Sequence, residues 1–210
     1  MKPGRVFISH TRDMALFPVG RPFGYQQTAR AAGRHLQLRT SAGPSAITGA
    51  ARVAAPDLRT WQQAVTWMET ERLNLHAAAG YAAQHGGLDG AGAIAAAMHG
   101  FLRSQGHWDQ ALALHRTALA LARHAGDRAG EAEALSNLGS MLALTADYDA
   151  ATASQEQALD LYRDLGNRLG EANARNDLGD IQRLTGDYPA ATASISAALE
   201  LYRGAPVTGG

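Results

Sequence analysis

The sequence predicts an all-α protein, a helix-turn-helix repeat solenoid of about three units that follows a poorly ordered N-terminal segment. Two observations predict this class. Alanine, which has the highest intrinsic helix propensity, supplies much of the 46% apolar content, whereas aromatic residues make up only 6% of the 210 residues. The last part of the chain also repeats itself at an offset of 40 positions, which indicates stacked copies of one supersecondary unit.

Two segments precede the helical region and differ from it in composition. Residues 1–23 contain a strand-like run, 5–9, followed by a loop that holds two prolines and a glycine. Residues 24–56 are rich in Gly, Ala, Ser, Thr and Arg, and they include a predicted helix around 25–38. Large apolar side chains are too few there to form a core, so we expect 24–56 to be a linker or poorly ordered.

A long leading helix is predicted within 57–90. Asp57 is a suitable N-cap, and Gly86-Gly87 is a suitable stop after Gln84. The apolar side chains that recur at roughly helical spacing between these signals are Trp61, Val65, Met68, Leu73, Leu75 and Tyr81.

Residues 91–204 form the predicted repeat array, and 205–210 a disordered tail. The segment 126–163 recurs at 166–203 with many identities, and a weaker copy lies 40 residues earlier. The three units are therefore about 91–124, 130–164 and 170–203. The identities in the two stronger copies include Gly126 with Gly166, Leu138-Gly139 with Leu178-Gly179, Asp147-Tyr148 with Asp187-Tyr188, and Leu161-Tyr162-Arg163 with Leu201-Tyr202-Arg203.

Each unit is expected to fold into two helices, which we term helix A and helix B. In the middle unit the apolar spacing predicts helix A over about 131–145 and helix B over about 148–165. Gly139 and Ala151 are small where the two helices must approach closely. Gly126 and Gly166 stand where a helix would end in a left-handed cap.

The order of these residues resembles the tetratricopeptide repeat. Leu178-Gly179, Gly186-Asp187-Tyr188, Ala191 and Ala198 fit the pattern of that family best. The 40-residue period is longer than the usual ~34 residues and is similar to the longer-linker version found in kinesin light chains and many bacterial regulators. The resemblance implies a right-handed helical array that binds a protein or peptide on its concave face, and that is not an enzyme.

Two further resemblances concern the region ahead of the array. The segment 61–76 resembles the junction that leads into the repeats of actinobacterial signal-transduction ATPases, although the chain has no G-x-x-x-x-G-K-[ST] phosphate loop. Residues 6–11 and 17–23 resemble the opening strand and loop of TIR-like domains, so 1–23 is expected to be a TIR-like fragment. These resemblances imply a role in bacterial signalling or regulation.

Composition excludes several kinds of chemistry. The chain has no cysteine, and its 19 Lys and Arg residues balance 19 Asp and Glu residues, so a nucleic-acid partner has no electrostatic support. No apolar run is long enough to span a bilayer, and no signal peptide is recognisable, which predicts a cytoplasmic protein without a membrane partner. The eight histidines show no compact ligand spacing, so we expect no metal and no cofactor.

The resemblance also places a partner-binding groove on the helix A face. Polar side chains at three- and four-residue spacing share one side of a helix, and asparagine can both donate to and accept from a peptide backbone. The expected groove residues are Glu133, Ser136, Asn137 and Ser140 of the middle unit and Asn173, Asn176, Asp180 and Arg183 of the last.

Two alternatives remain open from the sequence. The chain could be a truncated or vestigial relative of a multidomain regulator with no independent activity, or a TIR-like NAD-cleaving enzyme that uses 1–23. The last helix also lacks a following unit to cover Ile195, Leu199 and Leu201, which predicts self-association.

Overall fold

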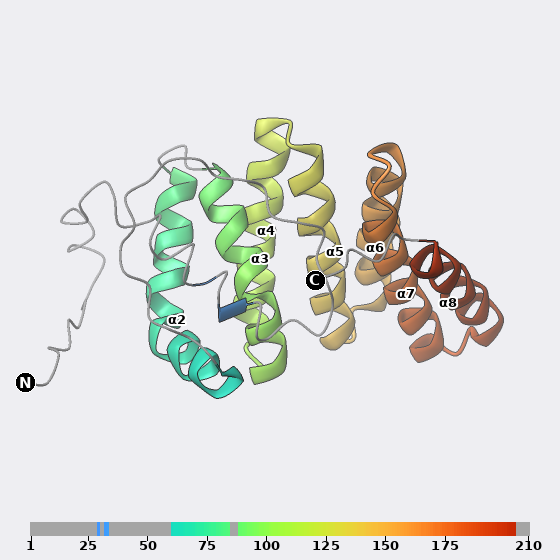
Figure 1. Cartoon of the computed structure of the whole chain (residues 1–210), viewed down its shortest axis with the longest axis horizontal. Helices are drawn as coiled ribbons and strands as arrows, with labels where there is room; N and C mark the ends of the chain where they lie inside the picture. The colour runs from blue at the N-terminus through green and yellow to red at the C-terminus, as the bar shows by residue number, and fades with distance from the viewer. Residues whose placement is uncertain (1–28, 30–31, 34–59, 85–87, 205–210) are drawn as a thin grey trace, which may run out of the picture.

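The computed structural model describes residues 29, 32–33, 60–84 and 88–204. In this part of the chain all regular structure is helical, and successive helices lie side by side in one row (Figure 1). The helices are α2 (Trp61–Gln84), α3 (Leu88–Gln105), α4 (Trp108–Ala125), α5 (Arg128–Leu144), α6 (Tyr148–Asp164), α7 (Arg168–Thr185) and α8 (Tyr188–Arg203). None of them is long and apolar enough to cross a membrane.

The three repeat units are confirmed as three helix hairpins, α3–α4, α5–α6 and α7–α8. Within each unit helix A contacts helix B, and each helix B then contacts helix A of the next unit. Helix A of the middle unit begins three residues earlier than the sequence predicts. It does so because Asp127 accepts a hydrogen bond from the Gly130 backbone N–H (2.9 Å) and so acts as its N-cap.

The segments 1–23 and 205–210 lie outside the described residues, and so does most of 24–56. Three residues inside the predicted helix at 25–38 are described, and all three are helical. Ala29 and Ala32 are fully buried. Gly33 lies so close to α3 that an added Cβ would come within 2.6 Å of the Ala97 carbonyl oxygen. Gly33 therefore packs closely on α3 of the first unit.

The leading helix begins at Trp61 and not at Asp57, so that prediction is wrong. Thr60 and Gln63 explain the later start, because they form a reciprocal capping box: the Gln63 N–H donates to the Thr60 hydroxyl (3.2 Å), and the Thr60 N–H donates to the Gln63 side-chain oxygen (3.1 Å). The apolar stripe is confirmed at Met68 and Leu75, which are buried. It fails at Trp61 and Leu73, which are exposed.

The turns between helices repeat one design. Asp147, Asn167 and Asp187 accept hydrogen bonds from the backbone N–H three residues later, as Asp127 does. The residue before each of these caps, and before His107, has a left-handed backbone. It is glycine at four of these five turns and Ala146, with φ 62°, at the remaining one. Because a Cβ is disfavoured in this conformation, Ala146 carries local strain that its glycine counterparts avoid.

Contact between helix A and helix B differs among the three units at one equivalent pair of positions. In the last two units a glycine on helix A, Gly139 or Gly179, makes room for the side chain of Gln155 or Ile195. In the first unit the same positions hold His99 and His115, whose ring nitrogens lie 3.1 Å apart. A hydrogen bond between imidazoles thus replaces close packing against glycine in the first unit.

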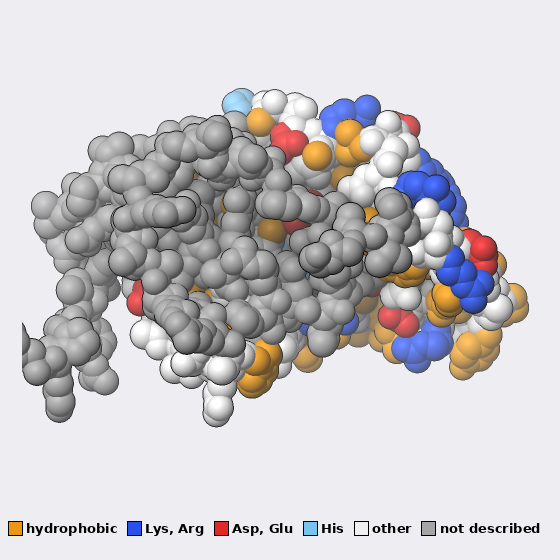
Figure 2. Space-filling model, viewed as in Figure 1, with side chains coloured by type: hydrophobic (Ala, Val, Ile, Leu, Met, Phe, Trp, Pro, Cys, Tyr) orange, Lys and Arg blue, Asp and Glu red, His pale blue; other side chains and the backbone are white. Residues whose placement is uncertain are grey.

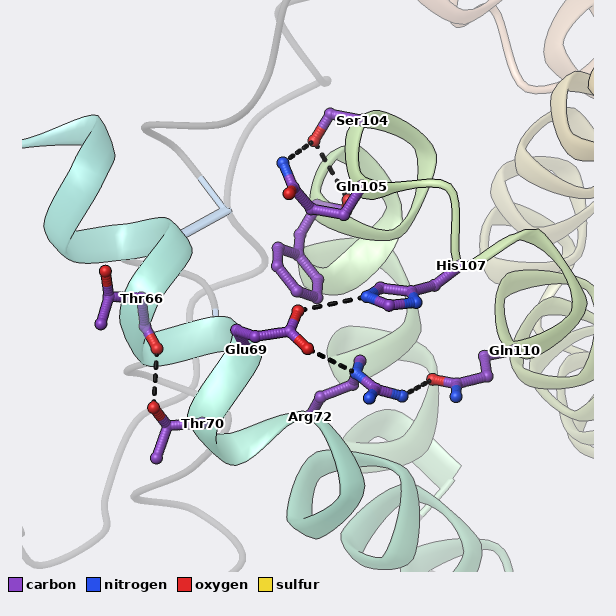
Figure 3. Close-up of polar contacts among 9 residues, drawn as sticks. Thr66, Glu69, Thr70, Arg72, Ser104, Gln105, His107 and Gln110 are labelled. Carbon is purple, nitrogen blue, oxygen red and sulfur yellow. Dashed lines mark hydrogen bonds and ion pairs between the residues drawn. The ribbon is translucent and has the colours of Figure 1, made fainter.

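Polar contacts attach α2 to the first unit, as Figure 3 shows. The Glu69 carboxylate lies 3.1 Å from His107 Nε2 and 3.4 Å from Arg72 Nε. Arg72 in turn donates to the side-chain oxygen of Gln110 at 2.7 Å. His107 stands where the later units have a capping aspartate and makes no side-chain cap bond. Its place in the repeat is therefore used to bind the leading helix.

Candidate functional site

The array has an inner side formed by the A helices. Helix α3 contacts α5, and α5 contacts α7, so the A helices of successive units touch each other. The B helices α4, α6 and α8 do not contact one another in the described structure. Because elements on the shorter side of a curved stack lie closer together, we take the A-helix side as the candidate concave face. The surface of α5 and α7 on that side is the candidate site.

The four groove residues expected on α7 differ in exposure. Asp180 and Arg183 are exposed and form an ion pair with N–O 3.6 Å along the same helix. Asn176 is half-buried, as is Asn173, which accepts a hydrogen bond from the Tyr202 hydroxyl at 2.6 Å. The spacing 176, 180, 183 puts three of these side chains on one side of the helix. Asn173 is additionally tied to α8.

The four groove residues expected on α5 are less accessible as a set. Glu133 is exposed and Asn137 is half-buried. Ser136 is buried, with 9% of its surface exposed, and its carbonyl oxygen accepts a hydrogen bond from Gln155 Nε2 at 2.9 Å. Ser140 is half-buried and donates to Asp177 of the next unit at 3.1 Å. The middle unit thus offers mainly Glu133 and Asn137 to a partner.

A buried polar junction between the last two units includes two residues that are not among the eight expected groove residues. The carboxylate oxygen Oδ2 of Asp177 accepts from both the Ser140 hydroxyl (3.1 Å) and Gln155 Nε2 (3.2 Å). Asp177 is 9% exposed, and Gln155 is fully buried. Two hydrogen bonds to one charged acceptor fix α7 relative to α5 and α6. The junction therefore holds the groove residues of both units in a constant arrangement.

The histidines of the first unit are packing residues with an unusual environment. His115 is fully buried against His99, and burial, with a further contribution from the charge of His76, lowers the pKa of His115 to about 3. Burial and the neighbouring Arg72 also lower the pKa of His76. In the described residues no group of three or more histidine or acidic side chains is placed to bind a metal ion.

Comparison with protein families gives matches over the repeat array. The model of a tetratricopeptide repeat matches residues 92–164 and 139–204, which together cover more than half of the chain. The chain belongs to the tetratricopeptide repeat family. A comparison with curated proteins finds no significant match. Tetratricopeptide arrays are generally protein-interaction modules, which agrees with the binding role expected from the sequence.

The tetratricopeptide assignment accounts for the glycines at the helix crossings and for the acidic caps. It does not account for Asp177, Gln155 or the His99–His115 pair, which vary between units. The sequence does mark the position of Gln155. At the offset of 40, the equivalent positions hold His115 in the first unit and Ile195 in the last. A repeat position whose side chain changes from an imidazole to an amide to an aliphatic group indicates a contact that differs from unit to unit.

Proposed function

We propose that this tetratricopeptide protein binds a peptide or an extended protein segment on the A-helix side of α5 and α7. The observation that carries the proposal is the contact pattern, in which A helices touch across units and B helices do not. This pattern supports an inner surface lined by Asn176, Asp180 and Arg183 in the last unit and by Glu133 and Asn137 in the middle unit.

The groove would recognise backbone and charge together. Asn176 can donate to a peptide carbonyl and accept from a peptide N–H, which fixes the register of an extended segment. Asp180 and Arg183 pair with each other in the free protein, and both are exposed. Exposed pairs are weak, so a partner can exchange this ion pair for its own charged contacts at small cost. Ser140 and Asp177 would act indirectly by keeping the two units in place.

A selection experiment tests the groove. Peptides selected from a random library on the full chain are titrated against wild type and against the double variant Asn176→Ala, Asp180→Ala. Loss of two hydrogen-bonding side chains is expected to weaken binding about tenfold or more. The matched control is Glu156→Ala, Asp160→Ala, two exposed positions on helix B of the middle unit. Equal binding by wild type and the Asn176 and Asp180 variant, with unchanged circular dichroism, would remove the groove from consideration.

We also propose a cytoplasmic role in bacterial signalling or regulation. This proposal is supported by the resemblance of 61–76 to the junction of signal-transduction ATPases and of 6–11 and 17–23 to TIR-like domains. Partners captured from a bacterial host by wild type, but not by the Asn176 and Asp180 variant, should include components of a regulatory pathway. Capture of metabolic enzymes alone would argue against that role.

Two alternatives have separate tests. A vestigial chain would select no peptide that distinguishes the groove variant from wild type. A TIR-like enzyme would release nicotinamide from NAD, and we expect no release because the resemblance to that domain covers only 6–11 and 17–23 of this sequence.

Self-association through α8 is a further alternative, in which the exposed Leu199 (44%) and Tyr202 (38%) would be the contacts. Size-exclusion chromatography over a range of concentrations tests it, with Leu199→Asp as the variant expected to stay monomeric.

A further inference from the structure

One surface of the last unit is more exposed than its equivalent in the middle unit. Leu159 and Tyr162 of α6 are 7% and 8% exposed because α7 packs on them, whereas the equivalent Leu199 and Tyr202 of α8 are 44% and 38% exposed. Hydrophobic side chains accordingly gather at the α8 end of the molecule (Figure 2). We define the end face as Leu199, Tyr202 and Arg203 of α8 together with Asp180 of α7.

The interface between α6 and α7 shows what fits such a surface. A Cβ on Gly170 would overlap the ring of Tyr162, so only glycine lets the first turn of α7 lie against this ring. The next residue, Glu171, pairs with Arg163 of α6 at 3.3 Å. The first unit repeats the ion pair, since Arg123 of α4 meets Glu131 of α5 at 2.7 Å.

Contacts within the last unit hold the side chains of the end face in an arrangement that could receive a similar Gly-Glu pair. The Tyr202 hydroxyl donates to Asn173 at 2.6 Å, which fixes the orientation of its ring. Arg203 pairs with Glu200 of its own helix at 2.8 Å, as Arg163 pairs with Asp160 at 3.3 Å while it also binds Glu171. Asp180 occupies the position in α7 that Ser140 occupies in α5. Ser140 donates to Asp177 of the next unit, and Asp177 lies seven residues after Gly170 in α7.

We propose that the end face docks the first turns of a helix supplied by a separate polypeptide, in which a Gly-Glu pair places its glycine on Tyr202 and its glutamate on Arg203. Asp180 adds a preference for a hydrogen-bond donor seven residues after that glycine. This surface shares Asp180 with the groove but is otherwise formed by α8, and its occupant is a helix and not an extended segment. A second copy of the chain does not offer this complement, because Gly170-Glu171 is packed on α6 and Gly130-Glu131 on α4 in its own array.

The sequence of α5 provides a peptide probe for the end face. A peptide with the sequence of residues 126–146 contains the Gly-Glu pair at 130–131 and carries Asn137 seven residues after the glycine. Fluorescently labelled, it is titrated into the full chain and is expected to bind saturably. The peptide with Gly130→Leu should bind about tenfold more weakly to wild type, because its side chain meets the Tyr202 ring, and should recover on Tyr202→Ala.

Two variant pairs locate the binding on the end face. Leu199→Asp is expected to weaken binding about tenfold, whereas Ala193→Asp, at an exposed position on α8 whose equivalent in α6 is also exposed, should leave it unchanged. The peptide with Glu131→Arg should bind about fivefold more weakly, and Arg203→Glu in the protein should restore it. Glu133→Arg in the peptide is the control: it makes the same charge change at a position that should not contact the end face, so binding should be unchanged.

Four results would overturn the proposal. The wild-type peptide could fail to bind at millimolar concentration, or Leu199→Asp could bind it as wild type does. The third is a dimer formed through α8 that the peptide does not displace, which would make a second copy the occupant of the end face. Peptide binding that the single variant Asn176→Ala abolishes would assign the peptide to the groove and would count against the end face in the same way.

Discussion

Acidification should destabilise the first unit through His115. In the folded protein burial lowers the pKa of His115 to about 3, whereas in the unfolded chain an exposed histidine titrates near 6.5. Between these values the unfolded chain binds about one more proton than the folded protein. The free energy of unfolding therefore falls as the pH drops from 6.5 toward 3, and this contribution is constant above 6.5.

The size of the effect follows from the shift. Each pH unit below 6.5 removes about 1.4 kcal/mol, so at pH 4.5 His115 alone costs about 3 kcal/mol of stability. For a chain of this length that corresponds to about 6–12 °C in Tm. His99 contacts His115, the charge of His76 acts on His115, and the charge of Arg72 acts on His76. The lowered pKa of His76 adds to the effect in the same direction.

The assay is urea unfolding at pH 7.5 and 4.5 for wild type and His115→Gln. Glutamine is the matched replacement because it occupies the equivalent position, 155, in the middle unit. Wild type should lose about 3 kcal/mol more than the variant between the two pH values, whatever the variant costs at pH 7.5. Parallel pH dependence in the two proteins would refute the assignment of a neutral, buried His115.

Three further substitutions probe the turns, the unit interface and the attachment of α2, each by thermal and urea unfolding. Ala146→Gly should raise the free energy of unfolding by about 1 kcal/mol because it relieves a left-handed alanine, and Gly186→Ala should lower it by a similar amount. Gly170→Leu should destabilise by about 2–3 kcal/mol, and by less when Tyr162→Ala makes room. Glu69→Gln should cost less than about 1 kcal/mol because its side chain is half exposed.

Much of the fold can be predicted from the sequence because the residues that define the repeat act on their near neighbours in the chain. Gly126 and Gly166 lie in turns whose geometry depends on a few neighbouring residues, so their roles can be read from the offset of 40. The start of α2 was harder to predict. Both Asp57 and Thr60 are suitable caps, and the choice depends on Gln63, whose side chain completes the capping box with Thr60.

The candidate site was less predictable because its geometry depends on contacts between units. Ser136 and Asn137 are adjacent polar residues in the sequence, yet one is buried and the other half-buried. Ser136 lies against Gln155, which is 19 positions away and donates to the Ser136 carbonyl oxygen, and the spacing of polar residues does not reveal this contact. The junction at Asp177 arises in the same way, since periodicity gives the face of each helix but not which neighbour covers it.

The most direct test of the central proposal is photo-crosslinking at single positions of the groove. A benzophenone amino acid placed at position 176 should crosslink a peptide selected on the full chain, whereas the same group at position 156, on helix B, should not. Crosslinking at 176 that unlabelled peptide suppresses is the result expected for a partner bound on the A-helix side. Crosslinking at 156 in place of 176 would contradict it and would move the binding surface to the outer side of the array.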